Sequence, residues 1–478
     1  MSLLIVGLDT TIVNVALPAI HRSFHSSLSG LQWTIDAYTL VLASLLMLSG
    51  STADRLGRRR VFQIGLTLFS LGSLLCAVAP SLGLLIAARV VQAIGGSMLN
   101  PVAMSIIRNV FEDPRERAQA IGVWGGVIGI SMALGPVVGG ALVDSVSWRM
   151  VFIVNVPIGL LAIALTALFV PESRAQRARR VDPVGQLLVI VALATLTYAI
   201  IEGPGSGWLS AQTLVLFAIS LVAFGSLVAY ELRRREPLLE IRFFGSAPFA
   251  GASAIAVAMF AALGGFLFLN TLYLQNVRGL SPLDAGLYTL PMAGLMLVVG
   301  PLAGRVVASR GTRLPLAGGS LALIASAAIL AQLTPTTPFG LLVVAYVLFG
   351  LGSGLINPPI TNTAVSGMPP SQAGVAAAVA STSRQVGQTL GVAVLGALAG
   401  DSAAGGLGRG FAVATHSSWW IILVLGVIIL ALALLTTTRW ALDTASRTAE
   451  RFREDAPAPP AGRPGPLPGD RPTTVPAA

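Results

Sequence analysis

The sequence predicts an all-α polytopic membrane protein with fourteen transmembrane helices. Of its 478 residues, 54% are hydrophobic and only 10% are charged, and the mean hydropathy is +0.81. A soluble domain carries about 25% charged residues, so water cannot be the main solvent of this chain. Three patterns refine this class: the spacing of apolar segments, the placement of arginine and an internal repeat.

Fourteen apolar segments are long enough to cross a bilayer, because a helix needs about 20 residues to span a hydrocarbon core of roughly 30 Å. The first segment has no basic region before it, so we expect this helix itself, and not a cleavable leader, to direct insertion. The expected spans are residues 2–20, 33–53, 61–79, 82–107, 118–142, 149–170, 184–201, 211–230, 249–274, 285–308, 314–333, 338–362, 373–399 and 418–438.

The arginines predict that both termini are cytoplasmic. With an even number of spans, 22 arginines fall on the side of the termini and four on the other, and cytoplasmic loops carry the excess of positive charge. The net charge of +10 is then an anchoring charge that faces the anionic lipids of the inner leaflet. It gives no reason to expect a nucleic acid as a partner.

An internal repeat divides the chain. Residues 96–101 (GSMLNP) resemble residues 353–358 (SGLINP), and two weaker matches occur in the same order at nearly the same offset. This offset corresponds to eight helices, so two six-helix repeats flank an inserted pair, as in secondary transporters. The predicted units are a six-helix bundle at 1–170, two linker helices with cytoplasmic loops at 171–248, a second six-helix bundle at 249–438 and a disordered cytoplasmic tail at 439–478.

The loop after the second span resembles the motif between helices 2 and 3 of the major facilitator superfamily. Its carboxylate and arginines lie where one helix ends and the next begins, so each can meet a helix terminus of opposite partial charge. The resemblance implies a conformational latch that holds two bundles together in an outward-facing state. The alternative is that the arginine run 58–60 only follows the positive-inside pattern. The candidate latch residues are Gly50, Asp54, Arg55, Gly57 and Arg58.

A glycine-rich stretch in the 118–142 segment resembles the antiporter motif found in exporters of that superfamily. Small residues allow close helix approach in a membrane, and proline removes a backbone donor and bends a helix. The resemblance links this stretch to export and to a limit on proton leak, whereas the alternative is the general abundance of glycine in membrane helices. The motif residues are Gly122, Gly135, Pro136, Gly139 and Gly140.

Two further stretches, LDTTIVNVALP at 8–18 and WRMVFIVNVP at 148–157, are similar to the 14-helix drug:proton antiporter branch of the superfamily. The resemblance implies the major facilitator fold, with two six-helix bundles plus two inserted helices, in a bacterial inner membrane. It also implies a proton-coupled secondary antiporter that exports drugs or antibiotics from the cytoplasm by alternating access. Export of an endogenous metabolite, or import of a nutrient by the same fold, are the alternatives.

Ionisable residues inside the spans are the candidates for coupling and for lining a substrate cavity. Each costs about 2.5–3.5 kcal/mol at a helix centre, so such residues usually have a function. Asp9 lies ~12 Å into the first span and is expected to take up and release a proton. Arg89 is expected near Asp36, which could pair with it, and Arg384 could bind an anionic group or reach an acid of the other bundle. Asn14 completes this set, and a purely structural ion-pair set is the alternative.

Other function classes fit poorly. No lysine is present, so the phosphate-binding loop of an ATP-driven pump is excluded, and the sparse acids do not supply the paired carboxylates of an enzyme. The three histidines lack metal spacing, so no metal and no cofactor is expected. The expected partners are a hydrophobic small-molecule substrate, protons and lipid, with the chain as a monomer.

Overall fold

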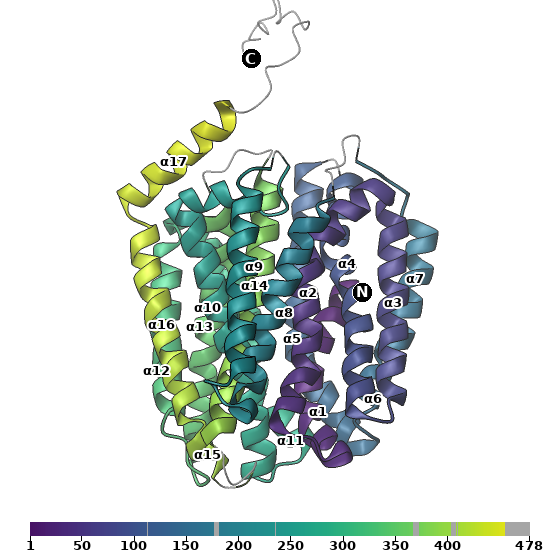
Figure 1. Cartoon of the computed structure of the whole chain (residues 1–478), viewed down its shortest axis with the longest axis vertical. Coiled ribbons are helices and arrows are strands. Elements are labelled where there is room, and N and C mark those ends of the chain that lie inside the picture. Colours follow the sequence, from purple (N-terminus) through teal and green to yellow (C-terminus); the bar gives the residue numbers. More distant parts are fainter. Residues whose placement is uncertain are drawn as a thin grey trace, which may run out of the picture.

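Long helices make up almost all of the chain. The computed structural model describes residues 1–111, 113–175, 181–234, 236–366, 372–402, 408 and 410–454 (Figure 1), and within these ranges the regular structure is helical, without strands. Helices are the expected answer to a bilayer, because each one satisfies its own backbone hydrogen bonds in a solvent without water.

The first group of helices covers the first 170 residues. The break between its last two members falls at Val154, so together they form one apolar span of 20 residues, Met150–Phe169. The helices are α1 (Ser2–Phe24), α2 (Leu28–Leu56), α3 (Arg58–Val78), α4 (Leu82–Val110), α5 (Pro114–Ser145), α6 (Met150–Ile153) and α7 (Asn155–Phe169).

Two helices, α8 (Pro183–Ser206) and α9 (Ala211–Glu231), follow as a hairpin. Each begins at a side-chain cap, since the Asp182 carboxylate accepts from the Gly185 N–H and the Ser210 hydroxyl accepts from the Thr213 N–H. These helices pack against each other, and α8 also packs against α2 and α14. The inserted pair predicted from the repeat offset therefore exists as two consecutive helices.

The second group begins with a short 3₁₀ turn and includes one π-helical turn. Its members are η1 (Ile241–Gly245), α10 (Ala247–Leu272), η2 (Tyr273–Val277), α11 (Pro282–Arg310), α12 (Arg313–Leu330), α13 (Phe339–Val365), α14 (Ala373–Ser402), α15 (Phe411–Ala414) and α16 (His416–Thr436). In Figure 1 α3, α4 and α7 lie on one side and α10, α12, α13 and α16 on the other, with α8 between them.

The number of spans agrees with the sequence. Twelve spans within the described residues are long and apolar enough to cross a membrane, and α5 and α14, with 32 and 30 residues, have the length as well. They bring the number of membrane-crossing helices to fourteen. Successive spans run in opposite directions, so the molecule has an α1/α2 end, where α1 ends and α2 begins, and an α2/α3 end, where Gly57 lies.

The two groups meet along two seams. On one, α5 packs against α11; on the other, α2 packs against α14, with α8 beside both. Two side chains link the groups toward the α1/α2 end. On the α2/α14 seam Gln32 Nε2 donates to the carbonyls of Val392 and Ala393 at 3.0 and 2.9 Å, and between η2 and α1 Gln275 Nε2 donates to the Val15 carbonyl at 2.9 Å. These hydrogen bonds hold the two groups of helices together at the α1/α2 end.

The prediction of a disordered tail at 439–478 is wrong for its first part. Residues Arg439–Glu454 form helix α17, which lies at an angle to the long helices across the end of the second group (Figure 1). Its buried stripe of alanines, Ala441, Ala445 and Ala449, repeats every four residues, as one face of a helix does. The Ala247 N–H donates to Thr444 Oγ1 at 2.9 Å, which fastens α17 to α10. Residues 455–478 lie outside the described residues.

Candidate functional site

Asp9 lies at the centre of a buried polar network in the first group of helices. Its Oδ2 accepts from Arg89 Nη1 at 2.5 Å, and its Oδ1 accepts from Gln92 Nε2 at 2.8 Å and from Asn155 Nδ2 at 3.1 Å. The three donors come from α4 and α7, and the side chains of Asp9 and Arg89 are 0% and 1% exposed. We call Asp9, Ser73, Arg89, Gln92 and Asn155 the Asp9 network.

The guanidinium of Arg89 is satisfied on several sides. Besides the carboxylate, Nη1 donates to Gln92 Oε1 at 2.7 Å and Nε donates to the Thr34 carbonyl at 3.1 Å. The Tyr38 ring lies 4.1 Å from Arg89 Cζ and adds a cation–π contact. A buried ion pair is stable only when further hydrogen bonds satisfy its remaining donors and acceptors, and these contacts supply them.

A second layer fixes the donors themselves. Ser73 Oγ on α3 accepts from Gln92 Nε2 at 2.7 Å and from Asn155 Nδ2 at 3.5 Å. The Cys76 thiol, one turn further along α3, donates to Gln92 Oε1 at 3.9 Å. Because the Gln92 oxygen also accepts from Arg89, the orientation of this amide is set. The Asp9 network thus joins four helices, α1, α3, α4 and α7.

The predicted pairing of Asp36 with Arg89 is wrong, because Asp9 occupies the guanidinium. Asp36 is fully buried on α2, where its Oδ1 accepts from Thr39 Oγ1 at 3.3 Å. Its Oδ2 has no hydrogen-bond partner within the described residues. Thr39 Oγ1 accepts in turn from Thr389 Oγ1 of α14 at 2.9 Å. The Thr39 hydroxyl therefore connects Asp36 to Thr389 of α14 across the seam between the two groups.

Two further predicted residues lie apart from the Asp9 network. Asn14 donates from Nδ2 to the Thr10 carbonyl of its own helix at 2.9 Å. Arg384 lies on α14 in the second group, where Nη2 donates to Thr361 Oγ1 of α13 at 2.5 Å. The structure brings neither residue to Asp9, and their roles in coupling or in a substrate cavity stay predictions.

The candidate latch residues form a tight turn at the α2/α3 end. The Asp54 carboxylate accepts from Arg58 Nε and Nη2 at 3.1 and 3.0 Å, and Gly50 lies where α2 passes Pro101 of α4. Gly57 has φ 113°, a left-handed conformation that glycine adopts without strain. Arg55 is exposed beside the turn. Within the described residues, the side-chain hydrogen bonds of this turn reach the first group and the connection that follows α7, so a latch between the two groups stays a prediction.

Glu172, in the connection after α7, was not among the predicted residues and completes this turn. Its two carboxylate oxygens accept from the backbone N–H groups of Arg59 and Arg60 at 3.1 and 3.2 Å. The carboxylate that meets a helix N-terminus is therefore Glu172 and not Asp54, and it stabilises the first turn of α3. A methyl group at Gly57 would lie 2.7 Å from Glu172 Oε1, which is a second reason for glycine there.

The glycines of the α5 motif let α5 pack between two helices. Methyl groups at Gly135 and Gly139 would overlap Thr11 and Ile12 of α1. A methyl group at Gly140 would lie 2.5 Å from the carbonyl oxygen of Pro282 in α11, and the Pro136 carbonyl lies against Gly286 of α11. One face of the motif thus touches the helix that carries Asp9, and another touches the opposite group. The surroundings of Gly122 lie outside what the structure describes.

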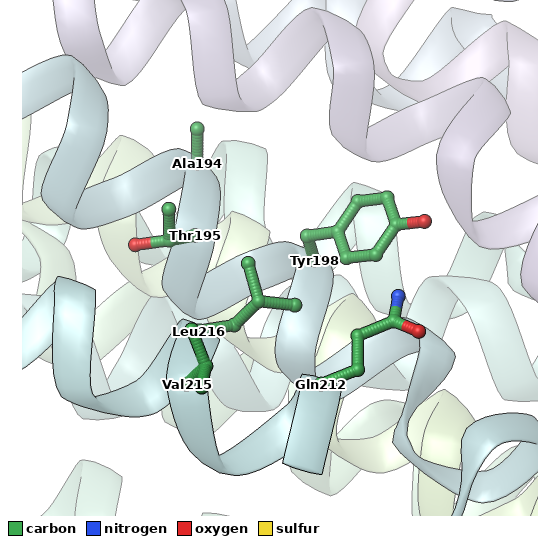
Figure 2. A pocket seen from close by; sticks show the side chains of 6 residues that line it. All are labelled: Ala194, Thr195, Tyr198, Gln212, Val215 and Leu216. Atoms are coloured by element: carbon green, nitrogen blue, oxygen red, sulfur yellow. The ribbon is translucent and has the colours of Figure 1, made fainter. Parts of the chain in front are cut away.

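A hollow of about 490 Å³ lies between α8 and α9, away from the Asp9 network. Figure 2 shows its lining, in which the Gln212 side chain extends toward the Tyr198 ring beside aliphatic side chains. It carries no ionisable acid or base with a role in coupling. Its lining residues are Ala194, Thr195, Tyr198, Gln212, Val215 and Leu216.

Residues 1–392 match the family model described as the Major Facilitator Superfamily. The multidrug resistance protein Stp of Mycobacterium tuberculosis is 39% identical over 398 residues, which cover 83% of this chain and 74% of that protein. The tetracenomycin C resistance and export protein of Streptomyces glaucescens is 36% identical over 399 residues, again covering 83% of this chain and 74% of that protein.

A solved structure shares the fold. A bacterial homolog of the human lysosomal transporter Spinster, in an inward-facing and unoccupied conformation, superimposes with a TM-score of 0.66 at 19% sequence identity. The similarity covers 94% of this chain and 96% of that chain. At this identity the likeness concerns the arrangement of the helices alone.

Proposed function

Because the chain belongs to the Major Facilitator Superfamily of membrane transporters, we propose that it is a proton-coupled antiporter that exports drugs or antibiotics from the bacterial cytoplasm. Relatives at 36% and 39% identity carry the names of a resistance and export protein and a multidrug resistance protein, which supports the direction of transport and the kind of substrate. The Asp9 network is the observation that carries the coupling.

Asp9 is suited to hold the coupling proton. It is a fully buried carboxylate in a transmembrane helix, paired with one cation. A proton on Asp9 cancels the charge that Arg89 faces, so the two protonation states differ in the strongest contact of the network. In the proposed cycle a proton from outside neutralises Asp9 while substrate leaves, and the proton is released to the cytoplasm after the two groups have rocked.

Helix α1 connects this proton to the seam. Thr11 and Ile12 follow Asp9 by two and three residues and touch Gly135 and Gly139 of α5. Helix α5 in turn meets α11 at Gly140 and Gly286. Since these contacts leave no room for a methyl group, a shift of α1 must be passed to α5. Close packing of this kind converts small displacements into a change between two states.

The arginine distribution supports an orientation with both termini in the cytoplasm. In that orientation the α1/α2 end, where the hydrogen bonds of Gln32 and Gln275 link the two groups, faces outward. We propose that this end of the molecule opens to the outside when α5 and α11 separate. The turn at Gly57 lies on the cytoplasmic side, where we propose that it acts as the latch when that side closes.

The test is Asp9→Asn in purified protein reconstituted into vesicles with an imposed pH gradient. We expect gradient-driven export of a fluorescent drug such as ethidium to be lost, because asparagine cannot exchange a proton. Exchange of ethidium between the two sides without a gradient should persist, which shows that the variant is folded and inserted. Asp144→Asn is the matched control, because Asp144 is an exposed acid on α5. Gradient-driven export that survives in Asp9→Asn removes Asp9 from the mechanism.

A further inference from the structure

Arg89 and Arg384 both lie inside transmembrane helices, and their surroundings differ. Arg89 faces a carboxylate, an amide, a carbonyl and an aromatic ring. Arg384 is the twelfth of the 30 residues of α14, ~17 Å from the start of the helix at 1.5 Å per residue. Both are thus deep in the apolar region, and only one has an anionic partner.

Arg384 lies where α10, α13 and α14 meet. Its Nη2 donates to Thr361 Oγ1 at 2.5 Å, and its Cζ lies 5.8 Å from the centre of the Phe260 ring. Its Nε is buried without a hydrogen-bond acceptor, and none of the ion pairs among the described residues includes Arg384. The guanidinium is therefore held in place but keeps unused donors.

A cation without a counter-ion is costly at this depth. Ionisable residues within membrane helices almost always face the interior of the helix bundle or a water-filled cavity, where they mark substrate or ion pathways. A guanidinium presents a planar fork of N–H donors that matches a carboxylate in two parallel hydrogen bonds. The Phe260 ring beside it provides an apolar face for the hydrophobic body of the same molecule.

Arg384 lies in the part of α14 nearer the α2/α3 end. Thr361 lies four residues before the end of α13, and Arg384 lies in the first half of α14, so both are in the half of the molecule toward the α2/α3 end. The hydrogen bonds of Gln32 and Gln275 that link the two groups lie toward the opposite end. The side chain of Arg384 is half-buried, with its Nε fully covered.

We propose that Arg384 binds the anionic group of the exported molecule, and that the substrate class includes hydrophobic carboxylates. This inference rests on the proposed function, since it names the chemistry of the substrate. The carboxylate would accept from the unused guanidinium donors, and the neighbouring Thr361 would keep the guanidinium oriented.

Binding of a matched pair of probes tests this assignment: pyrenebutyrate and its uncharged amide, pyrenebutyramide. The two share one aromatic body and differ in the carboxylate. Fluorescence titration of the purified protein in detergent is expected to give at least tenfold tighter binding of the acid than of the amide. Arg384→Gln should bring this ratio close to one, Arg384→Lys should keep part of it, and Arg447→Gln, which removes an exposed arginine of α17, should leave it unchanged.

Equal binding of acid and amide by the unmodified protein, or no binding of either, overturns the proposal. An acid preference that survives Arg384→Gln overturns it as well. The unmodified protein alone decides the first outcome, so a variant that folds poorly cannot hide it. The titration needs no proton gradient, so its result is independent of the Asp9→Asn experiment, and failure of one is distinguishable from failure of the other.

Discussion

Replacing Gly140 by alanine is expected to move the transporter away from the state that is closed at the α1/α2 end. The added methyl group would lie 2.5 Å from the Pro282 carbonyl oxygen and 2.7 Å from Leu283 Cα. Favourable contacts lie at about 3.5 Å or more, so α5 and α11 must separate by roughly 1 Å at this point. Both obstacles are backbone atoms, and therefore no side-chain rotation can relieve the overlap.

The size of the effect follows from the cost of overpacking, about 1–3 kcal/mol. This cost falls on the closed seam and is relieved when α5 and α11 part. The ratio of the two states should therefore change by about 5–150-fold. Gly294→Ala on α11 is the matched control, because a methyl group there has no atom within 4 Å.

The assay is a distance distribution between spin labels at Val146 and Val413. Both residues are exposed, at 67% and 60%, and each group of helices carries one of them near the α1/α2 end. The native cysteine, Cys76, is buried and can stay in place. We expect Gly140→Ala to populate a longer distance that Gly294→Ala does not. Identical distributions for the two variants would refute the argument that the α5 motif closes this seam.

Two smaller perturbations test neighbouring features. Gln32→Leu removes the two hydrogen bonds to the Val392 and Ala393 carbonyls, each worth about 0.5–1.5 kcal/mol. The distance distribution of the same label pair should therefore shift toward longer distances, as in Gly140→Ala. An unchanged distribution would show that these bonds do not hold the two groups together. Gly57→Ala forces a side chain into φ 113° and should lower the free energy of unfolding by about 1–3 kcal/mol. Thermal unfolding measures this against Gly83→Ala, where a methyl group meets open space. Equal melting temperatures of the two variants would contradict the argument that alanine is strained at position 57.

The family predicted from the motifs is confirmed, and so is the helical membrane fold. These features could be predicted because bilayer thickness fixes the length of each span and because the motifs lie in short, continuous stretches. Asp9 and Asn155 lie in two of these stretches, and Arg89 was predicted as an ionisable residue inside a span. Their assembly into one network could not be derived, because it depends on how four helices are rotated about their axes.

The wrong prediction that Asp36 pairs with Arg89 shows what the sequence alone does not determine. Asp9 and Asp36 are both acids in spans that neighbour α4, and spacing along the chain gives no preference between them. Ser73 was missed for a related reason, since a single serine in an apolar segment carries no signal of its own. Glu172 looked like an ordinary loop acid, because its partners are backbone groups of a helix more than a hundred residues away.

Helix α17 was missed although a signal was present. Residues 439–454 were predicted to be disordered together with the tail that follows them, but Ala441, Ala445 and Ala449 repeat at the spacing of one helix face. Alanine is a weak hydrophobic residue and a strong helix former, so a stripe of alanines is easily overlooked in a hydropathy average. The stripe packs against the rest of the protein, as the bond from Ala247 to Thr444 indicates.

The position of α8 has a consequence for molecules dissolved in the lipid. Because α8 packs against both α2 and α14, it shields one of the two lines along which the groups of helices separate, whereas no inserted helix among the described residues packs against both α5 and α11. The two sides of the protein that face the lipid at the seams are therefore different: one is covered by α8 and the other is not. A lipophilic compound that diffuses sideways in the bilayer would meet α8 on one flank and the α5/α11 contact itself on the other, so the inserted hairpin makes the two flanks of the repeated fold different.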